Sequence, residues 1–346
     1  RVLKDLALLQ RDMATTRPGG SDTLPANARA TLDQAIRSFE SAYIETSGIS
    51  DPQTLRSIRL TNARTFLDKS EAYAVLGQQA EAHEALREAI AIDSGLALAH
   101  LELGKFYYRL SQTDPVAPAT LAGVAGQPSA RLAFNSFVSA QQIAANPAAA
   151  NPELESEALY HMSRITTETP EQIPNADYDD AVTFAGLAYD RVNSFQNRAQ
   201  ECLARITRGN GGREAYLTGT NEEATAARSR CTGAMQSPES YLLSGQYQFR
   251  LSHFHAQRDQ QQDLQLAIIA FEEGAQLYDS NREPKSPAEQ RTRARLEMAK
   301  GVAQGCAGQP IIGQRIIDAL NAENPAGAAE AGQYLNTYKT LRCRPS

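Results

Sequence analysis

Residues 66–94 read FLDKSEAYAVLGQQAEAHEALREAIAIDS, and they indicate two helices joined by a tight turn. Ala82, Leu86 and Ala89 are spaced at i, i+4 and i+7, which places them on one face of the second helix. Small residues on such a face let two helices approach closely, and the leucine fills the space beside them. Gly77 favours the turn, because glycine accepts backbone conformations that other residues avoid. The stretch therefore predicts an antiparallel helix hairpin.

The same signal recurs with a period of 34 residues, since Ser70 and Tyr73 are matched by Gly104 and Tyr107. With this period and this pattern of small and aromatic residues, the chain resembles the tetratricopeptide repeat (TPR) family. It departs from the family pattern at Ser94, which stands where the closing Pro of the repeat is usual. The resemblance implies an all-α fold, a right-handed superhelical α-solenoid of antiparallel helix hairpins.

The resemblance is clearest in two repeats within residues 51–147 and looser elsewhere. The second repeat opens at Gly104, but its second helix, marked by Phe137, is delayed by an insertion at 111–129 that is rich in Pro, Gly and Ala. Such insertions are typical of surface loops. An open solenoid also needs a cap at its exposed end. The remaining segments are expected to be N-terminal helices at 1–50, degenerate repeats at 148–236, and C-terminal repeats with a capping helix at 237–346.

A later segment repeats the pattern of small and aromatic residues. Gly245 and Phe249 precede Phe271, which predicts another helix pair. We expect a lengthened hairpin between these two helices, with His253 and the glutamine run at 260–262 at its tip. Further helices are predicted at residues 3–13, 28–46, 291–304, 311–321 and 328–342.

The composition is that of a folded protein, and the net charge argues against one class of partner. The chain is 42% hydrophobic and 21% charged, as ordinary globular proteins are. Its 346 residues exceed the length at which a single hydrophobic core usually stops growing, so two or more domains or a repeat array are expected. The net charge of -6 argues against nucleic acid as a partner, since binding to phosphates depends on clustered Lys and Arg. The sequence has no run of roughly 18 apolar residues that could span a membrane, and no sustained period-two alternation that would indicate strands.

Cys202, Cys231, Cys306 and Cys343 lack the close pairs that zinc sites use, so no metal site is expected. Their grouping predicts one disulfide between Cys202 and Cys231 and another between Cys306 and Cys343, each joining neighbouring helices. Four buried free thiols are the alternative. Disulfides form in oxidising compartments, and the chain begins at Arg1 with neither an initiator Met nor a signal-peptide pattern. We therefore expect an extracytoplasmic protein that is periplasmic, secreted or on the cell surface.

The TPR resemblance implies a binding groove formed by the first helix of each hairpin. Members of the family usually bind an extended peptide or a partner helix there. Carried over position by position, the groove is rich in aromatic and arginine side chains, which are favoured anchors of protein interfaces. The alternative is that these are ordinary packing or surface residues. The residues expected to face the groove are Arg64, Glu71, Leu101, Lys105, Tyr108, Arg109, Tyr160, Arg164, Gln246, Phe249 and Arg250.

The sequence carries no catalytic signature. It has no Ser or Cys nucleophile motif, no phosphate loop and no dinucleotide fingerprint, so neither an enzymatic reaction nor a cofactor is expected. His253 and His255 could offer two imidazoles to a metal, but a solvated pair in a loop is the interpretation that we favour. His83, His100 and His161 are each isolated on predicted helices, where a histidine is more often a packing residue than a ligand.

These features favour a non-enzymatic scaffold, an exported or cell-surface protein of bacterial type that binds a protein or peptide partner. The alternative is a structural subunit that binds copies of itself. Because the two ends of a solenoid differ, contact between copies would be heterologous and would build a ring or a head-to-tail helical filament. An enzyme is the remote alternative, since repeats of this kind rarely carry catalysis.

Overall fold

The computed structural model describes residues 26–148, 150–210, 217, 222–233, 236–254, 257–280 and 285–337. Within these ranges the regular elements are helices, and β-type pairing is limited to one isolated bridge between Val116 and Pro128. The predicted all-α class is therefore confirmed. None of the helices in these ranges combines the length and the apolar character needed to span a bilayer. The chain divides into two compact units, called here unit 1 (Arg1–His161) and unit 2 (Met162–Ser346).

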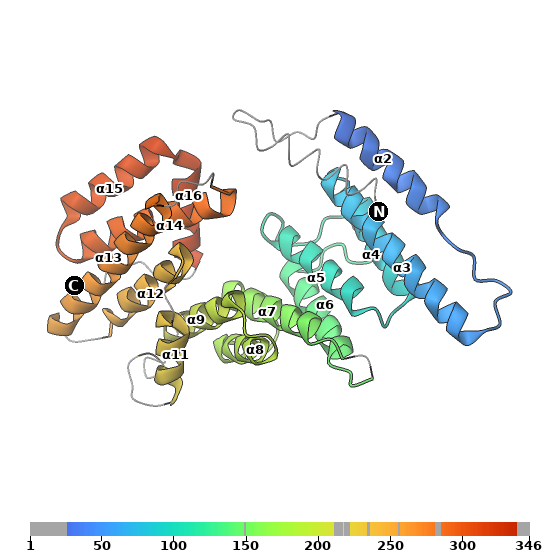
Figure 1. Ribbon diagram of the computed structural model, residues 1–346, viewed down its shortest axis with the longest axis horizontal. Coiled ribbons are helices and arrows are strands. Elements are labelled where there is room, and N and C mark those ends of the chain that lie inside the picture. Colours follow the sequence, from blue (N-terminus) through green and yellow to red (C-terminus); the bar gives the residue numbers. More distant parts are fainter. Residues whose placement is uncertain are drawn as a thin grey trace. The chain divides into compact units, whose positions relative to one another are not determined.

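Unit 1 is built from helices that pack against their neighbours in the chain (Figure 1). They are α2 (Ala26–Ser41), α3 (Pro52–Val75), α4 (Gln79–Ile92), α5 (Ala97–Ser111), α6 (Ser129–Ala144) and the first part of α7 (Pro152–Glu168). Two hairpins, α3/α4 and α5/α6, follow one another, while α2 lies on α3 and α4 lies on α5. α2 ends earlier than the predicted residue 46. The helix predicted at 3–13 lies outside the described residues.

The hairpin predicted from residues 66–94 is present as α3/α4. Gly77 forms the turn with φ of 76°, in the left-handed region that favours glycine. Ala82, Leu86 and Ala89 are buried, as their spacing predicted. The small residues on α4 thus lie in the interior of the hairpin stack, where they allow its neighbours to pack closely.

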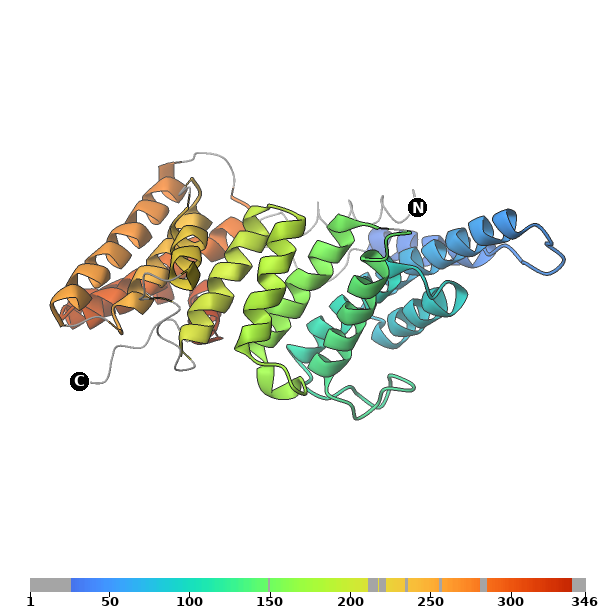
Figure 2. The same cartoon turned by 90° about the horizontal axis from the view of Figure 1, so that it is seen from below.

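In the second hairpin, α5 and α6 cross where Gly104 faces Phe137. A Cβ atom on Gly104 would lie 2.5 Å from the Phe137 ring, closer than such atoms can approach, and the ring is fully buried. The segment between Ser111 and Ser129, where an insertion was predicted, joins the two helices as an irregular loop (Figure 2). Glycine at 104 is therefore required by the close crossing of the two helices.

Unit 2 continues the same construction. Its elements are the last part of α7, the 3-10 helix η1 (Pro170–Gln172), α8 (Tyr178–Arg191), α9 (Phe195–Asn210), α11 (Glu222–Thr232), α12 (Pro238–Leu251), α13 (Gln257–Ser280), α14 (Pro287–Cys306), α15 (Pro310–Glu323) and α16 (Pro325–Thr337). The pairs α8/α9, α12/α13 and α14/α15 pack as neighbours, and α16 packs on α14 and α15.

One hairpin of each unit has a similar sequence in its first helix, with four of ten positions identical. α5 reads LELGKFYYRL over residues 101–110, and α12 reads LLSGQYQFRL over residues 242–251. Gly245 lies against Phe271 as Gly104 lies against Phe137, and here too a Cβ atom would clash with the ring. The α5/α6 and α12/α13 hairpins are thus built around the same close contact between a glycine and a phenylalanine.

The hairpin of unit 2 differs from the prediction in one respect. The glutamine run at 260–262 does not lie at the hairpin tip, because α12 ends at Leu251 and α13 already begins at Gln257. Glutamine is a good helix former, and the next turn of α13 buries Leu264, so the helix extends through the polar run. His253 does lie in the turn, as expected.

A disulfide bond joins two helices of unit 2. Cys202 of α9 is bonded to Cys231 of α11, with 5.1 Å between their Cα atoms, and this confirms the first predicted bridge. Both sulfurs belong to a buried apolar cluster that includes Leu243 and Tyr247 of α12. Cys343 lies outside the described residues, so the second predicted bridge stays a prediction.

Candidate functional site

The α5 helix presents a lysine between two carboxylates. Lys105 Nζ lies 2.9 Å from an oxygen of Glu102 on the same helix and 2.6 Å from an oxygen of Glu157 on α7. Burial alone would lower the pKa of Lys105, but the two carboxylates raise it above its ordinary value. Lys105 therefore stays charged and joins α5 to α7.

Aromatic rings beside this lysine form a layer around His161. The His161 ring stacks on Phe137 with 4.9 Å between ring centres, and the Tyr108 and Tyr160 rings lie 6.2 and 5.0 Å from it. Tyr108 is buried, whereas Tyr160 is partly exposed. The structure thus brings three predicted groove residues together where α5 meets α7, but only Lys105 and Tyr160 are partly exposed there, and the burial of Tyr108 corrects the expectation that it faces an open groove. We call this surface, together with Arg109 one turn beyond Lys105, the α5 face.

Other predicted groove residues of unit 1 and α7 lie in different surroundings. Leu101 is fully buried, so it is a core residue and not a surface anchor. It precedes Gly104 by three residues and therefore shares the side of α5 that packs against α6. Arg64, Glu71 and Arg109 are exposed. Arg164 forms an ion pair of 3.0 Å with a glutamate one turn later on α7.

In unit 2, two predicted groove residues of α12 are covered. Gln246 and Phe249 are fully buried, which corrects the expectation that they face an open groove. Arg250 is partly exposed, and its guanidinium lies 4.3 Å from the centre of the Phe254 ring. The physical reason for the burial of Phe249 is that its hydrophobic cluster is shared by three further helices, with Phe271 of α13, Leu296 of α14 and Leu335 of α16 among its members.

α16 was predicted only as a cap near residues 328–342. The helix is present, and its Tyr334 packs against the cluster that contains Phe249. Burial raises the pKa of Tyr334, and the positive charge of Arg295 on α14 partly offsets this. Nothing in the short, alanine-rich sequence of α16 indicated which face it would cover, since small residues pack against many surfaces.

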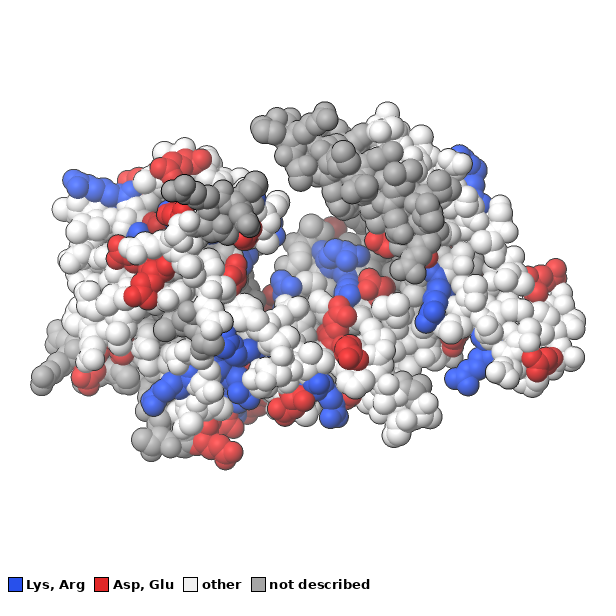
Figure 3. All heavy atoms as spheres, viewed as in Figure 1, with Lys and Arg blue, Asp and Glu red and all other residues white. Residues whose placement is uncertain are grey.

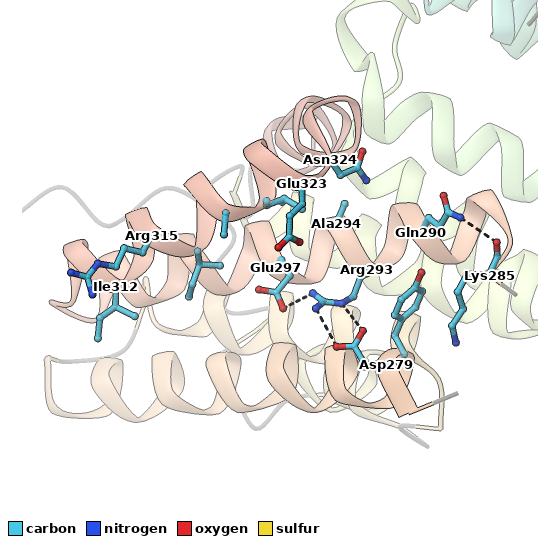
Figure 4. A pocket seen from close by; sticks show the side chains of 14 residues that line it. Asp279, Lys285, Gln290, Arg293, Ala294, Glu297, Ile312, Arg315, Glu323 and Asn324 are labelled. Carbon is cyan, nitrogen blue, oxygen red and sulfur yellow. Dashed lines mark hydrogen bonds and ion pairs between the residues drawn. The ribbon is translucent and has the colours of Figure 1, made fainter. Parts of the chain in front are cut away.

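A groove in unit 2 lies elsewhere, between α13, α14 and α15 (Figure 4). It measures about 990 Å³, and Ile312 and Arg315 line one end of it. At its centre Arg293 pairs with Asp279 at 3.1 Å and with Glu297. Burial alone would lower the pKa of Arg293, but these carboxylates raise it. Arg293, Asp279 and Glu297 therefore pair with one another, and α15 adds a wall of mixed character, with Ile312 and Ile316 beside Arg315 and Glu323.

Charged side chains of both signs are interspersed over the face of the molecule shown in Figure 3. In the part of the chain that the structure describes, no group of three or more His, Cys, Asp and Glu side chains is placed to hold a metal ion. His253 Nδ1 lies 3.1 Å from the Phe249 carbonyl oxygen within its own turn, and His255 lies outside the described residues. The structure therefore does not test the histidine pair as a ligand site.

Comparison with known proteins does not identify a family for this chain. No protein-family model matches the chain, and no curated protein is significantly similar to it in sequence. The function must therefore be inferred from the geometry of the helices and their faces.

A buried histidine and a buried tyrosine meet where α4 packs on α5. His83 Nε2 is 2.7 Å from the hydroxyl of Tyr107, and both side chains are buried, which confirms His83 as a packing residue. Burial lowers the pKa of His83, Arg87 lowers it further, and Glu84 opposes this. Burial also raises the pKa of Tyr107 to about 12. Both groups are therefore neutral at neutral pH, which suits a hydrogen bond between them.

We expect His83 to make the stability of the protein depend on pH. Because the folded protein binds a proton at His83 less readily than the unfolded chain, the contribution of His83 is complete above the unfolded pKa of about 6.5 and declines as the pH falls below it. The slope from one such group is at most about 1.4 kcal/mol per pH unit. Urea unfolding at pH 7.5, 6.5 and 5.5 should show the decline. His83→Gln, which keeps a partner for Tyr107 but does not titrate, should reduce it.

His100 also has a pKa lowered by burial, so His100→Gln should remove a separate part of the same decline. An undiminished slope in His83→Gln would contradict the assignment.

Proposed function

We propose that the protein is a non-enzymatic scaffold of the TPR type that binds a partner protein through the faces of its first helices. We further propose that its hairpins stack into a right-handed superhelical α-solenoid. The pairing of neighbouring helices in both units supports this architecture. The recurrence of the contact between Gly104 and Phe137 as the contact between Gly245 and Phe271 also supports it, because repeats of one structural unit are what a solenoid is made of.

The observation that carries the proposal is the docking of α16 in unit 2. There, a surface that includes residues of the first helices α12 and α14 packs a further helix, which buries Leu335 beside Phe249. A surface that holds a helix of its own chain has the shape and the chemistry to hold a helix of another chain. In unit 1, the corresponding α5 face carries exposed Arg109 and partly exposed Tyr160. Arginine and tyrosine are the residue types that most often anchor interfaces.

We place this scaffold in an extracytoplasmic compartment. The Cys202–Cys231 disulfide is the support for that location, because such bonds persist in oxidising environments. Its two sulfurs are buried, so the bond belongs to the core of unit 2 and is not an exposed redox group.

Substitutions on the α5 face test the proposal. We expect Arg109→Glu with Tyr160→Ala to reduce capture of the partner from an extract of the source cells at least tenfold relative to the unmodified protein. The matched control is Arg131→Glu, which changes an exposed arginine on the second helix, α6. Capture would be measured by quantitative mass spectrometry, after circular dichroism has shown equal helicity and melting for all three proteins. Equal capture by the double variant and the control would contradict binding through the α5 face.

A further inference from the structure

We infer that unit 2 contains a binding pocket for a small aromatic carboxylic acid, with Arg198 of α9 as the group that pairs with the carboxylate. The pocket measures about 380 Å³ and lies where the turn between α8 and α9 meets the start of α12. It uses none of the residues of the α5 face, so the inference goes beyond the proposed function and does not depend on it. The described residues that line the pocket include Tyr189, Ser194, Phe195, Arg198, Ser237 and Ser240.

The charge of the pocket is not balanced by the protein. Arg198 is the one charged side chain among the described residues that line it. This arginine is partly buried, makes no hydrogen bond or ion pair with any described residue, and has an Nε atom that is shielded from water. The neighbouring Arg205 and Arg230 differ, since both pair with Glu201. A partly buried guanidinium without a counter-charge is unfavourable, and a bound carboxylate would supply that charge.

The helices around Arg198 fix the place of its guanidinium. The guanidinium carbon lies 5.2 Å from the centre of the Phe195 ring, three residues earlier on α9. Just after α11, a Cβ atom at Gly233 would lie 3.2 Å from Arg198 Nη1, so glycine leaves room for the guanidinium there. The unpaired charge is therefore held between α9 and the end of α11.

A serine hydroxyl adds a second donor. Ser194 Oγ accepts a hydrogen bond of 3.2 Å from the backbone N–H of Asn197, and its own proton has no acceptor among the described residues. Ser194 and Arg198 are four residues apart, which places them on the same side of the start of α9. Both also line the pocket, so a carboxylate bound there can accept hydrogen bonds from a guanidinium and a hydroxyl.

A single positive charge favours a carboxylate over a phosphate. A carboxylate carries one negative charge and can accept two parallel hydrogen bonds from a guanidinium. A phosphate monoester carries a charge of about -1.5 to -2 at neutral pH. No second cation among the described lining residues would balance it.

Two aromatic side chains in the lining favour a ligand that carries a ring of its own. Phe195 is 42% exposed, and Tyr189 is partly exposed. Arg230 lies against Tyr189, with 4.0 Å between its guanidinium carbon and the ring centre, and this contact holds the tyrosine in place. Aromatic rings gain from offset or edge-to-face contact beyond the area that they bury. The volume lies near the lower end of the range for small-molecule sites, about 300–1,000 Å³, so the ligand is small.

Phenylacetate is the probe that tests the inference, because it combines one carboxylate with one aromatic ring. Its binding to the full-length oxidised protein would be measured by ligand-observed NMR at millimolar concentrations. We expect phenylacetamide, which has nearly the same shape but no charge, to bind at least tenfold more weakly. Acetate, which has no ring, and phenyl phosphate, whose second charge has no partner, should also bind more weakly. Failure of phenylacetate to bind, or equal or tighter binding of any of the other three compounds, would overturn the inference.

Two arginine variants distinguish the pocket from general attraction between charges. Arg198→Met removes the charge and keeps an apolar side chain, and it should weaken the binding of phenylacetate at least tenfold. The matched control is Arg191→Gln, which removes an exposed positive charge at the end of α8 and should bind phenylacetate as the unmodified protein does. Equal losses in the two variants, or no loss in Arg198→Met, would overturn the assignment of Arg198.

Stability without ligand separates a binding residue from a structural one. Because Arg198 lacks a counter-charge, Arg198→Met should leave the urea midpoint unchanged or raise it. Arg230→Met changes an arginine that also lies against an aromatic ring but is paired with Glu201, and it should lower the midpoint. A lower midpoint for Arg198→Met, or a failure of this variant to fold, would give Arg198 a structural role and overturn the inference.

The pocket and the α5 face can fail separately. If phenylacetate binds as expected but Arg109→Glu with Tyr160→Ala captures the partner normally, the pocket stands and binding through the α5 face fails. If phenylacetate does not bind but the α5-face variant loses the partner, the scaffold stands and the pocket fails.

Discussion

Replacing Phe137 with alanine, or Phe271 with alanine, should lower the free energy of unfolding by about 3–5 kcal/mol in each case. Both rings are fully buried, and each lies against a glycine of the facing helix. Removing such a ring leaves a cavity, because two packed helices cannot move together far enough to fill it. The measurement is urea unfolding followed by circular dichroism, since the chain has no Trp to serve as a fluorescent probe. Ile311→Ala, at a side chain that is 69% exposed, is the control and should change stability by no more than about 0.5 kcal/mol.

A double-mutant cycle makes this prediction more specific. Gly104→Ala alone should destabilise the protein by about 1–3 kcal/mol, because its methyl group would meet the Phe137 ring. In the Phe137→Ala background the same change should be neutral or stabilising, since the space is empty and alanine favours helix over glycine by about 1 kcal/mol. Additive effects would contradict the direct contact on which both hairpins are built.

Replacing Glu201 with alanine should have an effect of similar size on unit 2, a loss of about 3–5 kcal/mol. Glu201 is buried on α9 and binds two arginines, Arg205 at 2.8 Å and Arg230 of α11 at 2.6 Å. Without its carboxylate, Arg230 would lose its counter-charge and Arg205 would lose one of two, in surroundings where water reaches both only in part. Arg205 would keep Glu223, and Arg230 would keep only its contact with the Tyr189 ring, 4.0 Å away.

The control for Glu201 is Glu222→Ala, an exposed carboxylate in the first turn of α11. It should change the free energy of unfolding by less than about 1 kcal/mol. Glu201→Gln, which keeps the shape and removes the charge, should fall between the two. The Cys202–Cys231 bond still joins α9 to α11 in all three variants, so a loss measured under oxidising conditions reports the ion pairs and not the disulfide. A loss below about 1 kcal/mol in Glu201→Ala would contradict a structural role for this network.

The first of these predictions concerns a contact between helices that are neighbours in the chain, and this is where sequence patterns were informative. The spacing of Ala82, Leu86 and Ala89 predicted a buried face, and the structure buries it against neighbouring helices. The helices of the second hairpin were also predicted, together with the loop at 111–129. Local patterns succeed here because the partner of each helix is the next helix in the chain.

The candidate site shows the limit of such patterns. Leu101 and Phe249 were expected to line a groove, yet both are buried, and Gln246 is buried with them. A helical pattern indicates which residues share a face, but it does not indicate how many other helices meet that face. The glutamine run at 260–262 was misplaced for a related reason, since polar residues are typical both of loops and of exposed helix surfaces.

The sequence by itself thus determined the helical class, the hairpins of neighbouring helices, the insertion loop and the bridge between Cys202 and Cys231. These features follow from residue spacing and from elements adjacent in the chain. Only the tertiary structure decided that Leu335 of α16 joins the cluster of Phe249, that the His161 ring lies near both Tyr108 and Phe137, and that Glu201 is buried between two arginines. Such contacts depend on which helix faces meet in space. The type of a side chain indicates the kind of partner it requires, apolar or of opposite charge, but not which distant residue is that partner.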